Sequence, residues 1–344
     1  MAACQSATTR LDKLEAPYLP PENVRAAIER GLYELNKYSD LGLAHRLRTH
    51  IAYQNNVEPE LVVPVAGRIE AIKLVLEYTI KLMRRKPRII IPRPGLQEYR
   101  TYVEACAGDI VELSLVEQND VWRLSLDELF SNMNEKSLII LDNPSDPTGS
   151  MIIRGLREAK EIISEACRNN TLVMIDESFY EFSGFTLVDF VNEYNCLVIV
   201  RSMEQAYALA GIGLAYLIAP REISREITKL APSPPRLSLL AGIAALENRE
   251  YYLKMVERLI AERERTRQLL LGLNGVHAYR SWANFLLVKT SIGKLAEKLC
   301  SRGIAVANTQ IADNYVRVTI GNQGDNNSFL AALARLLREE SKLT

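Results

Sequence analysis

Short apolar runs rich in β-branched residues alternate along this chain with longer segments whose apolar residues recur at helical spacing. Residues 140–149, 172–180 and 200–216 each begin with, or directly follow, such a run. A run of this length and character is typical of a parallel strand that is buried on both faces. The alternation of these strands with helical segments predicts an α/β fold with a doubly wound, mainly parallel sheet.

The same patterns predict the other elements and the organisation of the chain. Prolines favour an extended arm over residues 1–25 and a hinge at 232–235. We therefore expect an arm (1–25) that packs with a small domain, a large domain (26–235), and a small C-terminal domain (236–344). Strands are predicted near 61–65, 88–92, 110–115, 284–288 and 315–320, and helices near 21–30, 99–107, 151–168, 249–272, 293–302 and 326–341.

Polar residues follow each of the three central strands. In an open α/β sheet, ligands bind beside the carboxyl ends of the strands, so these residues should surround one crevice. The residues concerned are Asn143, Asp146, Asp176, Ser202 and Gln205. The sequence thus predicts a single site at this edge of the sheet.

Composition narrows the class of protein. The chain has 344 residues with 42 basic and 42 acidic side chains, so it lacks the basic excess of a nucleic-acid-binding protein. No apolar run reaches the roughly 18 residues of a membrane span, and the first residues lack the charged and apolar regions of a signal peptide. The five cysteines are scattered without metal-ligand spacing. We expect a cytoplasmic protein with reduced thiols and no metal.

The motifs in the three central stretches carry a family resemblance. They read Asn143-Pro-Ser-Asp-Pro-Thr-Gly149, Asp176-Glu-Ser-Phe-Tyr180 and Ser202-Met-Glu-Gln-Ala-Tyr-Ala-Leu-Ala-Gly211. They resemble the Asn-Pro-x-Asn-Pro-Thr-Gly, Asp-Glu-Ala-Tyr and Ser-x-x-Lys-x-x-x-Leu-x-Gly motifs of fold-type I pyridoxal phosphate (PLP) aminotransferases. The chain is most similar to the histidinol-phosphate aminotransferase and threonine-phosphate decarboxylase branch. The resemblance implies a mainly parallel central sheet flanked by helices, with a smaller C-terminal α/β domain.

The resemblance also implies roles for residues around the cofactor. Asp176 would hold the pyridine nitrogen, and Ser202 would contact the phosphate. Gly67 is retained at the helix start that binds the phosphate in the family. The neighbouring Arg68 could hold an anion at this helix start, or it could equally be a surface arginine. Tyr38 would reach the cofactor phosphate of a neighbouring subunit in a homodimer, or it is a partly buried loop tyrosine.

Two further positions match the family's substrate site. Arg317, in Val-Arg-Val-Thr-Ile-Gly, matches the arginine that clamps the substrate carboxylate with two hydrogen bonds. Asn284 lies in the matching Ala-Asn-Phe segment. By this resemblance the chain keeps the outline of an amino-acid or carboxylate site.

Five positions depart from the family pattern. Gln205 stands where the family has its Schiff-base lysine, and a carboxamide is neither a nucleophile nor a base near neutral pH. Asp146 replaces an asparagine, and its carboxylate would repel the cofactor's O3′ oxygen. The other departures are Leu96 for the stacking ring, Phe179 for a tyrosine, and Gly213 for an arginine.

Three functional hypotheses follow. The first is a non-catalytic homologue, a pseudoenzyme, that binds a small carboxylate, an amino acid, or a partner protein such as a paralogous aminotransferase subunit. The second is a lysine-free transferase or lyase that uses PLP or pyridoxamine phosphate (PMP) on an amino acid or phosphorylated amino acid. The third is an ordinary transaminase whose lysine is elsewhere, although no lysine lies between Lys160 and Lys229. Nucleic-acid and membrane partners are not expected.

Overall fold

The central layer of the protein is a seven-stranded sheet. The structure, a computed structural model, describes residue 4 and residues 7–39, 41–83, 86–105, 108–133 and 136–341. The strands lie in the order β2 (Val62–Val65), β10 (Ala215–Ile218), β9 (Leu197–Ser202), β8 (Leu172–Asp176), β7 (Ser137–Asp142), β3 (Arg88–Arg93) and β4 (Asp109–Ser114). Strands β9, β8, β7, β3 and β4 run parallel, and β10 is antiparallel to both its neighbours. The predicted mainly parallel sheet is confirmed.

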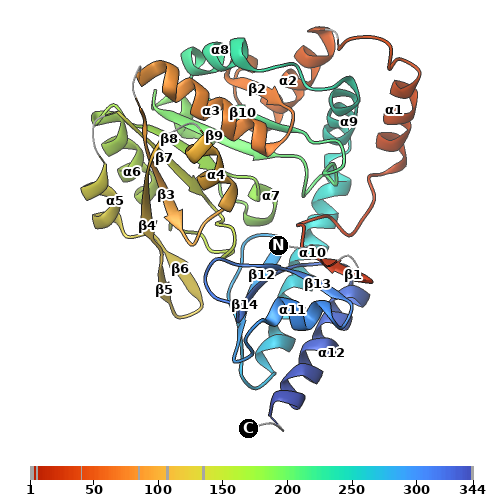
Figure 1. Cartoon of the computed structure of the whole chain (residues 1–344). Coiled ribbons are helices and arrows are strands. Elements are labelled where there is room, and N and C mark those ends of the chain that lie inside the picture. Colours follow the sequence, from red (N-terminus) through yellow and green to blue (C-terminus); the bar gives the residue numbers. More distant parts are fainter. Residues whose placement is uncertain are drawn as a thin grey trace.

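Helices cover both faces of this sheet (Figure 1). They are α3 (Arg68–Met83), α4 (Gln97–Ala105), α5 (Leu126–Asn132), α6 (Leu156–Arg168), α7 (Tyr180–Ser183) and α8 (Arg221–Leu230). Successive strand residues point to opposite faces, so one strand feeds two apolar clusters. Leu138 and Ile140 of β7 pack in one cluster, whereas Ile139 and Leu141 pack in the other. The continuous apolar runs of the sequence are the consequence of this double burial.

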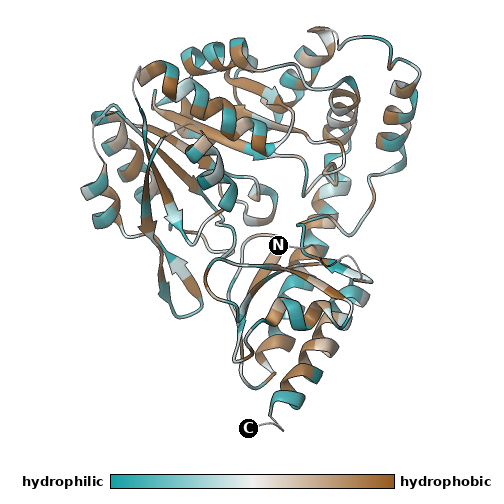
Figure 2. Ribbon diagram, in the orientation of Figure 1, coloured by the Kyte–Doolittle hydropathy of each residue, from teal (hydrophilic) through white to brown (hydrophobic). Residues whose placement is uncertain are grey.

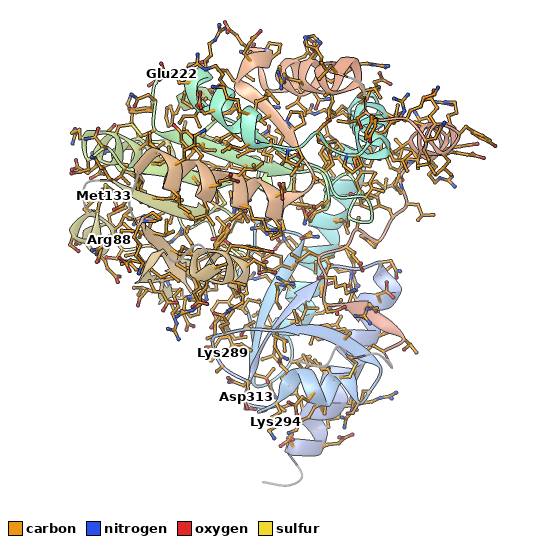
Figure 3. The ribbon with its side chains drawn as sticks, turned by 45° about the horizontal axis from the view of Figure 1, so that its top comes forward. Arg88, Met133, Glu222, Lys289, Lys294 and Asp313 are labelled. Atoms are coloured by element: carbon orange, nitrogen blue, oxygen red, sulfur yellow. A yellow bond between two sulfur atoms is a disulfide. The ribbon has the colours of Figure 1, made fainter. Side chains whose placement is uncertain are left out.

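A smaller unit is built on a second sheet of five strands. Its order is β1 (Thr9–Leu11), β13 (Ile304–Asn308), β14 (Tyr315–Thr319), β12 (Phe285–Thr290) and β11 (Val276–Ala278), and only β1 and β13 pair in parallel. The helices α10 (Arg249–Leu271), α11 (Leu295–Cys300) and α12 (Gln323–Glu340) accompany it. Apolar residues line the strands of both sheets (Figure 2). In Figure 3, Lys289, Lys294 and Asp313 lie on this smaller unit, and Arg88, Met133 and Glu222 lie on the larger one.

The remaining elements connect the two units. Helices α1 (Glu22–Leu32) and α2 (Leu41–Asn55) pack against α9 (Arg236–Glu247). A hairpin of β5 (Val116–Gln118) and β6 (Val121–Arg123) extends toward the smaller unit, where the Tyr279 hydroxyl donates to Glu117 at 2.7 Å. Short 3-10 turns span Pro59–Leu61 and Val188–Asn192. The arm joins the smaller sheet through β1, while the domain boundaries at residues 25 and 235 stay a prediction.

Some element boundaries differ from those expected. The helix predicted over 151–168 begins only at Leu156, because the extended Gly155 precedes its first turn. The helix predicted over 99–107 begins at Gln97 and is described to Ala105, since residues 106 and 107 lie outside the described residues. Among the described helices, none combines the length and apolar character that a membrane crossing requires.

The expectation of reduced thiols is wrong for four of the five cysteines. Cys4 is joined to Cys300 and Cys167 to Cys196, with Cα–Cα distances of 5.8 and 5.6 Å. The paired residues are 296 and 29 positions apart in the sequence, so their spacing carried no sign of pairing. Cys106 lies outside the described residues. The first disulfide fastens the N-terminal arm to the end of α11.

Candidate functional site

The carboxyl edge of β7, β8 and β9 gathers the predicted polar residues, as their place after the strands indicates. Asn143 directly follows β7, and Asp176 ends the neighbouring strand β8. The backbone N–H of Asn143 donates to the backbone carbonyl of Asp176 at 2.9 Å. All five residues of the predicted crevice are buried: Asn143, Asp146, Asp176, Ser202 and Gln205. Their side chains, however, make contacts that the sequence did not predict.

Asp176 has a full set of hydrogen-bond donors from its own chain. Its Oδ2 accepts from Arg68 Nε at 2.6 Å and from the Tyr99 hydroxyl at 2.9 Å. Its Oδ1 accepts from the Ser178 amide at 2.9 Å and from the Ser178 hydroxyl at 2.5 Å. A carboxylate has about four acceptor directions, and four donors use them here. Asp176 is therefore a satisfied buried ion.

Arg68 is the cation that balances this carboxylate. It begins α3 and is 6% exposed, so the expectation of a surface arginine is wrong. Burial lowers the pKa of Arg68, but the neighbouring Asp176 and Tyr99 raise it by more than burial lowers it. The pKa of Arg68 therefore lies well above its usual value. The guanidinium also lies 5.8 Å from the centre of the Phe179 ring. Arg68 is thus a charged core residue locked to β8.

A second carboxylate, Glu204, lies at the start of the same helix. Its Oε1 accepts a long hydrogen bond from the Arg68 amide at 3.4 Å. Gly67 has a φ of +98°, and a Cβ placed on it would lie 2.7 Å from this oxygen. Burial raises the pKa of Glu204, although the Arg68 amide and guanidinium act in the opposite direction. The Ser202 hydroxyl, predicted to contact phosphate, instead accepts from the Glu204 amide at 3.0 Å.

Arg317 and Asp146 form a buried ion pair between the two units. Arg317 Nη1 lies 2.8 and 2.7 Å from the two carboxylate oxygens of Asp146. Arg317 Nη2 donates to the Asp12 carbonyl at 2.9 Å, so the N-terminal arm joins the same contact. Arg317 comes from β14 of the smaller sheet, whereas Asp146 comes from the loop after β7. The predicted substrate clamp is occupied by an internal carboxylate.

Asp142 is the last residue of β7 and contacts the loop that carries Asp146. Its Oδ2 accepts from the Asp146 amide at 2.6 Å, which orients the loop. Burial raises the pKa of Asp142 to about 7, despite the opposing effects of this hydrogen bond and of Arg68. Near neutral pH this carboxyl group is therefore protonated in a substantial fraction of molecules.

Gln205 occupies the loop that follows β9. Its side chain is 8% exposed, and its Oε1 is buried without a hydrogen-bond partner in the described part of the chain. The Tyr18 hydroxyl donates to the Ala206 carbonyl at 2.7 Å and holds the loop from the arm side. A buried carboxamide oxygen can accept a hydrogen bond but cannot form a covalent bond to a carbonyl carbon or move a proton.

The other predicted residues are distributed around this cluster. Asn284 is buried, and its amide nitrogen donates to the Leu14 carbonyl at 2.9 Å. Phe179 packs edge-on against Phe285 at 5.4 Å. Leu96 is partly buried against the cluster of apolar residues that includes Ile89. Asn284 thus secures the arm.

Tyr38 does not join the site within one chain. It is 98% exposed, so the reading as a partly buried loop tyrosine is wrong. Its predicted role toward a neighbouring subunit stays a prediction.

The sequence reasoning missed three residues of the cluster. Tyr99 donates to Asp176 from α4, Glu204 caps α3, and Asp142 orients the Asp146 loop. Glu204 is adjacent to Gln205, and Asp142 is adjacent to Asn143, so the motifs pointed to their neighbourhood. Tyr99 carried no such signal. No group of three or more His, Cys, Asp or Glu side chains fit for a metal ion occurs among the residues described.

Comparison with known proteins gives one consistent result. Residues 9–333 match the family described as aminotransferase class I and II. The histidinol-phosphate aminotransferase of Sulfurisphaera tokodaii is 30% identical over 333 residues, which cover 95% of this chain and 90% of that protein.

Solved structures agree in fold. The histidinol-phosphate aminotransferase of Clostridium acetobutylicum has a TM-score of 0.84 at 24% identity, covering 96% of this chain and 99% of that one. The Sinorhizobium meliloti histidinol-phosphate aminotransferase, solved in complex with pyridoxal-5′-phosphate, has a TM-score of 0.85 at 19% identity, covering 97% and 91%. At such identities the likeness establishes the fold, and the chemistry must be argued from the residues.

Proposed function

The chain belongs to the aminotransferase class I and II family, and we propose that it is a member without transaminase activity. The proposal rests on Gln205. Transamination needs a primary amine that bonds to the cofactor and then carries a proton between carbon atoms. A carboxamide supplies neither function, because its nitrogen is not basic near neutral pH.

No other residue supplies the missing amine. No lysine lies between Lys160 and Lys229, a segment that includes β8, α7 and β9. In the described part of the chain, none of the buried charged residues is a lysine. This observation argues against an ordinary transaminase whose lysine comes from another element.

PLP is the cofactor of the family, and the residues present do not fit it. Asp176, which would hold the pyridine nitrogen, already has four donors from Arg68, Tyr99 and Ser178. Glu204 places a carboxylate at the helix start where the phosphate would bind. An anion beside an anion is unfavourable in a partly buried site.

A second candidate is lysine-free chemistry with PMP, acting on an amino acid or a phosphorylated amino acid. It is favoured by the retention of Asp176 at the end of β8 and by the unpaired Gln205 Oε1, which could accept from an amine. The same candidate requires Arg68 to leave Asp176, with which it forms a buried ion pair at 2.6 Å. We rank it below the non-catalytic reading.

Ligand binding without catalysis is compatible with the retained Arg317 and Asn284. A small carboxylate or amino acid at Arg317 would have to displace Asp146, whose two oxygens lie within 2.8 Å of Arg317 Nη1. The substrate of the histidinol-phosphate aminotransferases is therefore not assigned to this chain. A macromolecular partner remains the better-supported alternative to a small ligand.

We infer that the protein forms a homodimer through the segment from α1 to α2. Its large apolar and aromatic side chains are exposed, among them Tyr38 at 98% and Leu41 at 88%. Tyr33, Leu35 and Tyr53, in the same segment of the chain, are also exposed. Exposed large apolar side chains that are concentrated in one segment support an interaction site there. A paralogous aminotransferase subunit could cover the same surface in a heterodimer. Mixing the two purified chains would show whether the homodimer or the heterodimer forms.

The test of the proposed function is an amino-transfer assay on the purified protein with added PLP. Histidinol phosphate serves as the amino donor with 2-oxoglutarate as acceptor, and the Sulfurisphaera tokodaii relative serves as the positive control. We expect no turnover above the PLP-only background and no visible absorbance of lysine-bound PLP. Turnover that disappears in Gln205→Ala would contradict the proposal.

A further inference from the structure

We propose that Arg68, Glu204 and Asp146 act as a built-in ligand that closes the inherited cofactor and substrate positions to pyridoxal phosphates and carboxylates. The inference rests on the family membership that underlies the proposed function and deepens it. Each of the three side chains meets a different binding group of the site.

Arg68 takes the position of the pyridine nitrogen. It gives Asp176 a charged N–H donor at 2.6 Å, which is what a protonated pyridine ring would offer. Tyr99 and Ser178 provide the remaining donors, so a ring nitrogen has no free acceptor direction to approach. Binding a cofactor here would leave the Arg68 guanidinium buried without its counterion, which is strongly unfavourable.

Glu204 takes the position of the phosphate. The N-terminus of α3 presents backbone N–H groups that favour an anion. Glu204 Oε1 already accepts from the Arg68 amide and lies against Gly67. Its backbone is held by the Ser202 hydroxyl, so the residue expected to bind phosphate positions the carboxylate that replaces it. A phosphate would meet both a filled volume and a like charge.

Asp146 takes the position of the substrate carboxylate. Arg317 Nη1 lies within 2.8 Å of both of its oxygens, and Arg317 Nη2 is bonded to the Asp12 carbonyl. The Asp146 side chain is 3% exposed and the Arg317 side chain 15%, so water screens the pair weakly. The pair also joins the larger unit to the smaller one and to the arm. The Arg317–Asp146 contact thus occupies the arginine that would bind a substrate carboxylate, and it also joins the two units.

The three contacts together leave no unmatched cation for an anionic ligand to neutralise. Arg68 is paired with Asp176, and Arg317 is paired with Asp146. Glu204 adds a carboxylate with a raised pKa. The buried atoms without a hydrogen-bond partner include three acceptors, Gln205 Oε1, Asn284 Oδ1 and Asp142 Oδ1, and two donors, Arg317 Nε and Asn143 Nδ2. The two donors could bind an anion only after Asp146 had left Arg317. The site is organised against the ligands of its own family.

Calorimetric titration of the full-length protein with PMP, pyridoxamine and 2-oxoglutarate tests the inference, because none of these needs a lysine to bind. We expect no saturable binding to the wild type at millimolar concentrations. Glu204→Ser should bind PMP at least about tenfold more tightly than wild type and leave pyridoxamine, which lacks the phosphate, unaffected. Arg68→Ser/Glu204→Ser should improve the binding of both amines. Asp146→Asn should improve the binding of 2-oxoglutarate and leave the binding of the two amines unchanged.

Controls separate the inference from misfolding and from the proposed function. Arg221→Ser/Glu58→Asn breaks an exposed ion pair with the same change of charge and should bind none of the probes. Glu204→Ser leaves the Arg68–Asp176 ion pair intact, so it stays informative if an Arg68 variant unfolds. If the wild type binds PMP as tightly as Glu204→Ser does, the proposal that these side chains act as a built-in ligand is wrong. Such binding without turnover would leave the loss of transaminase activity standing.

Discussion

The carboxyl edge of the large sheet and the surface from α1 to α2 differ in the burial and pairing of their side chains. At the sheet edge, Arg68, Asp176, Asp146 and Arg317 are buried or largely buried and bonded to one another. From α1 to α2, large apolar side chains such as Leu41 and Tyr53 are exposed to solvent. The charges of the first region are paired within the chain, whereas the apolar side chains of the second are exposed.

This difference shows where binding energy remains available. A buried ion pair gains little further from an added ligand, because the ligand must first break it and leave a charge unpaired. Exposed apolar surface releases free energy when a partner covers it, at about 25 cal/mol per Å². This contrast supports the proposal that the protein interacts with its partner through the α1–α2 surface. The following predictions test each side of that contrast.

The largest expected effect is on the Arg68–Asp176 pair. Arg68→Met leaves the Asp176 carboxylate buried without a cation, so the free energy of unfolding should fall by about 3–5 kcal/mol. Urea denaturation followed by circular dichroism measures the change. The double variant Arg68→Met/Asp176→Asn removes both charges and should recover most of the loss. Losses that simply add would mean that the two residues do not stabilise each other.

The next effect depends on pH through Asp142. Its pKa in the folded protein is raised to about 7 from 3.8, so the folded state binds the proton more tightly than the unfolded state. Stability contributed by the protonated group is therefore lost as the pH rises from about 4 through about 7. Asp142→Asn should be more stable than wild type by on the order of 2 to 4 kcal/mol at pH 8, with a difference that shrinks toward pH 4. Equal pH profiles for the two proteins would contradict this.

A smaller effect is expected at the contact between the two units. Asp146→Asn weakens a charged contact with Arg317 but keeps the Asp12 carbonyl as a partner, so about 2 kcal/mol should be lost. Limited proteolysis at a fixed protease ratio should then cut near the prolines at 232–235 faster than in wild type. Glu58→Gln, on the exposed pair with Arg221, is the matched control and should leave the cleavage rate unchanged.

The smallest effect on folding belongs to the exposed surface. Leu41→Asp changes a side chain that is 88% exposed, so the free energy of unfolding of the single chain should change by less than about 0.5 kcal/mol. The measured mass should nevertheless fall from dimer to monomer, because a charge would be buried at the proposed interface. Multi-angle light scattering measures the mass. A wild-type protein that is already monomeric would remove the surface side of the contrast.

Much of the architecture was predictable because it depends on local pattern. The apolar runs before Asn143, Asp176 and Ser202 became β7, β8 and β9, since a strand buried on both faces needs an uninterrupted apolar sequence. Their polar ends met at one edge because parallel strands end together. The start of α6 was less predictable, because an amphipathic pattern does not say where an extended Gly155 delays the first turn.

The contacts of the site were not predictable in the same way. Arg68 and Asp176 are 108 positions apart, and Arg317 and Asp146 are 171 apart. Nothing near Arg68 in the sequence distinguishes a buried cation from a surface one. The two disulfides escaped prediction for the same reason, since Cys4 and Cys300 are neighbours only in the folded chain.

The sequence by itself determined the fold class, the family resemblance and the chemistry that is missing at Gln205. These follow from the identity of residues and from periodicities that each segment carries alone. Only the tertiary structure decided that Arg68, Glu204 and Asp146 face the groups that would otherwise hold a cofactor and a substrate. Pairing of charges is set by distance and burial, and both quantities come into being only when distant segments pack against one another.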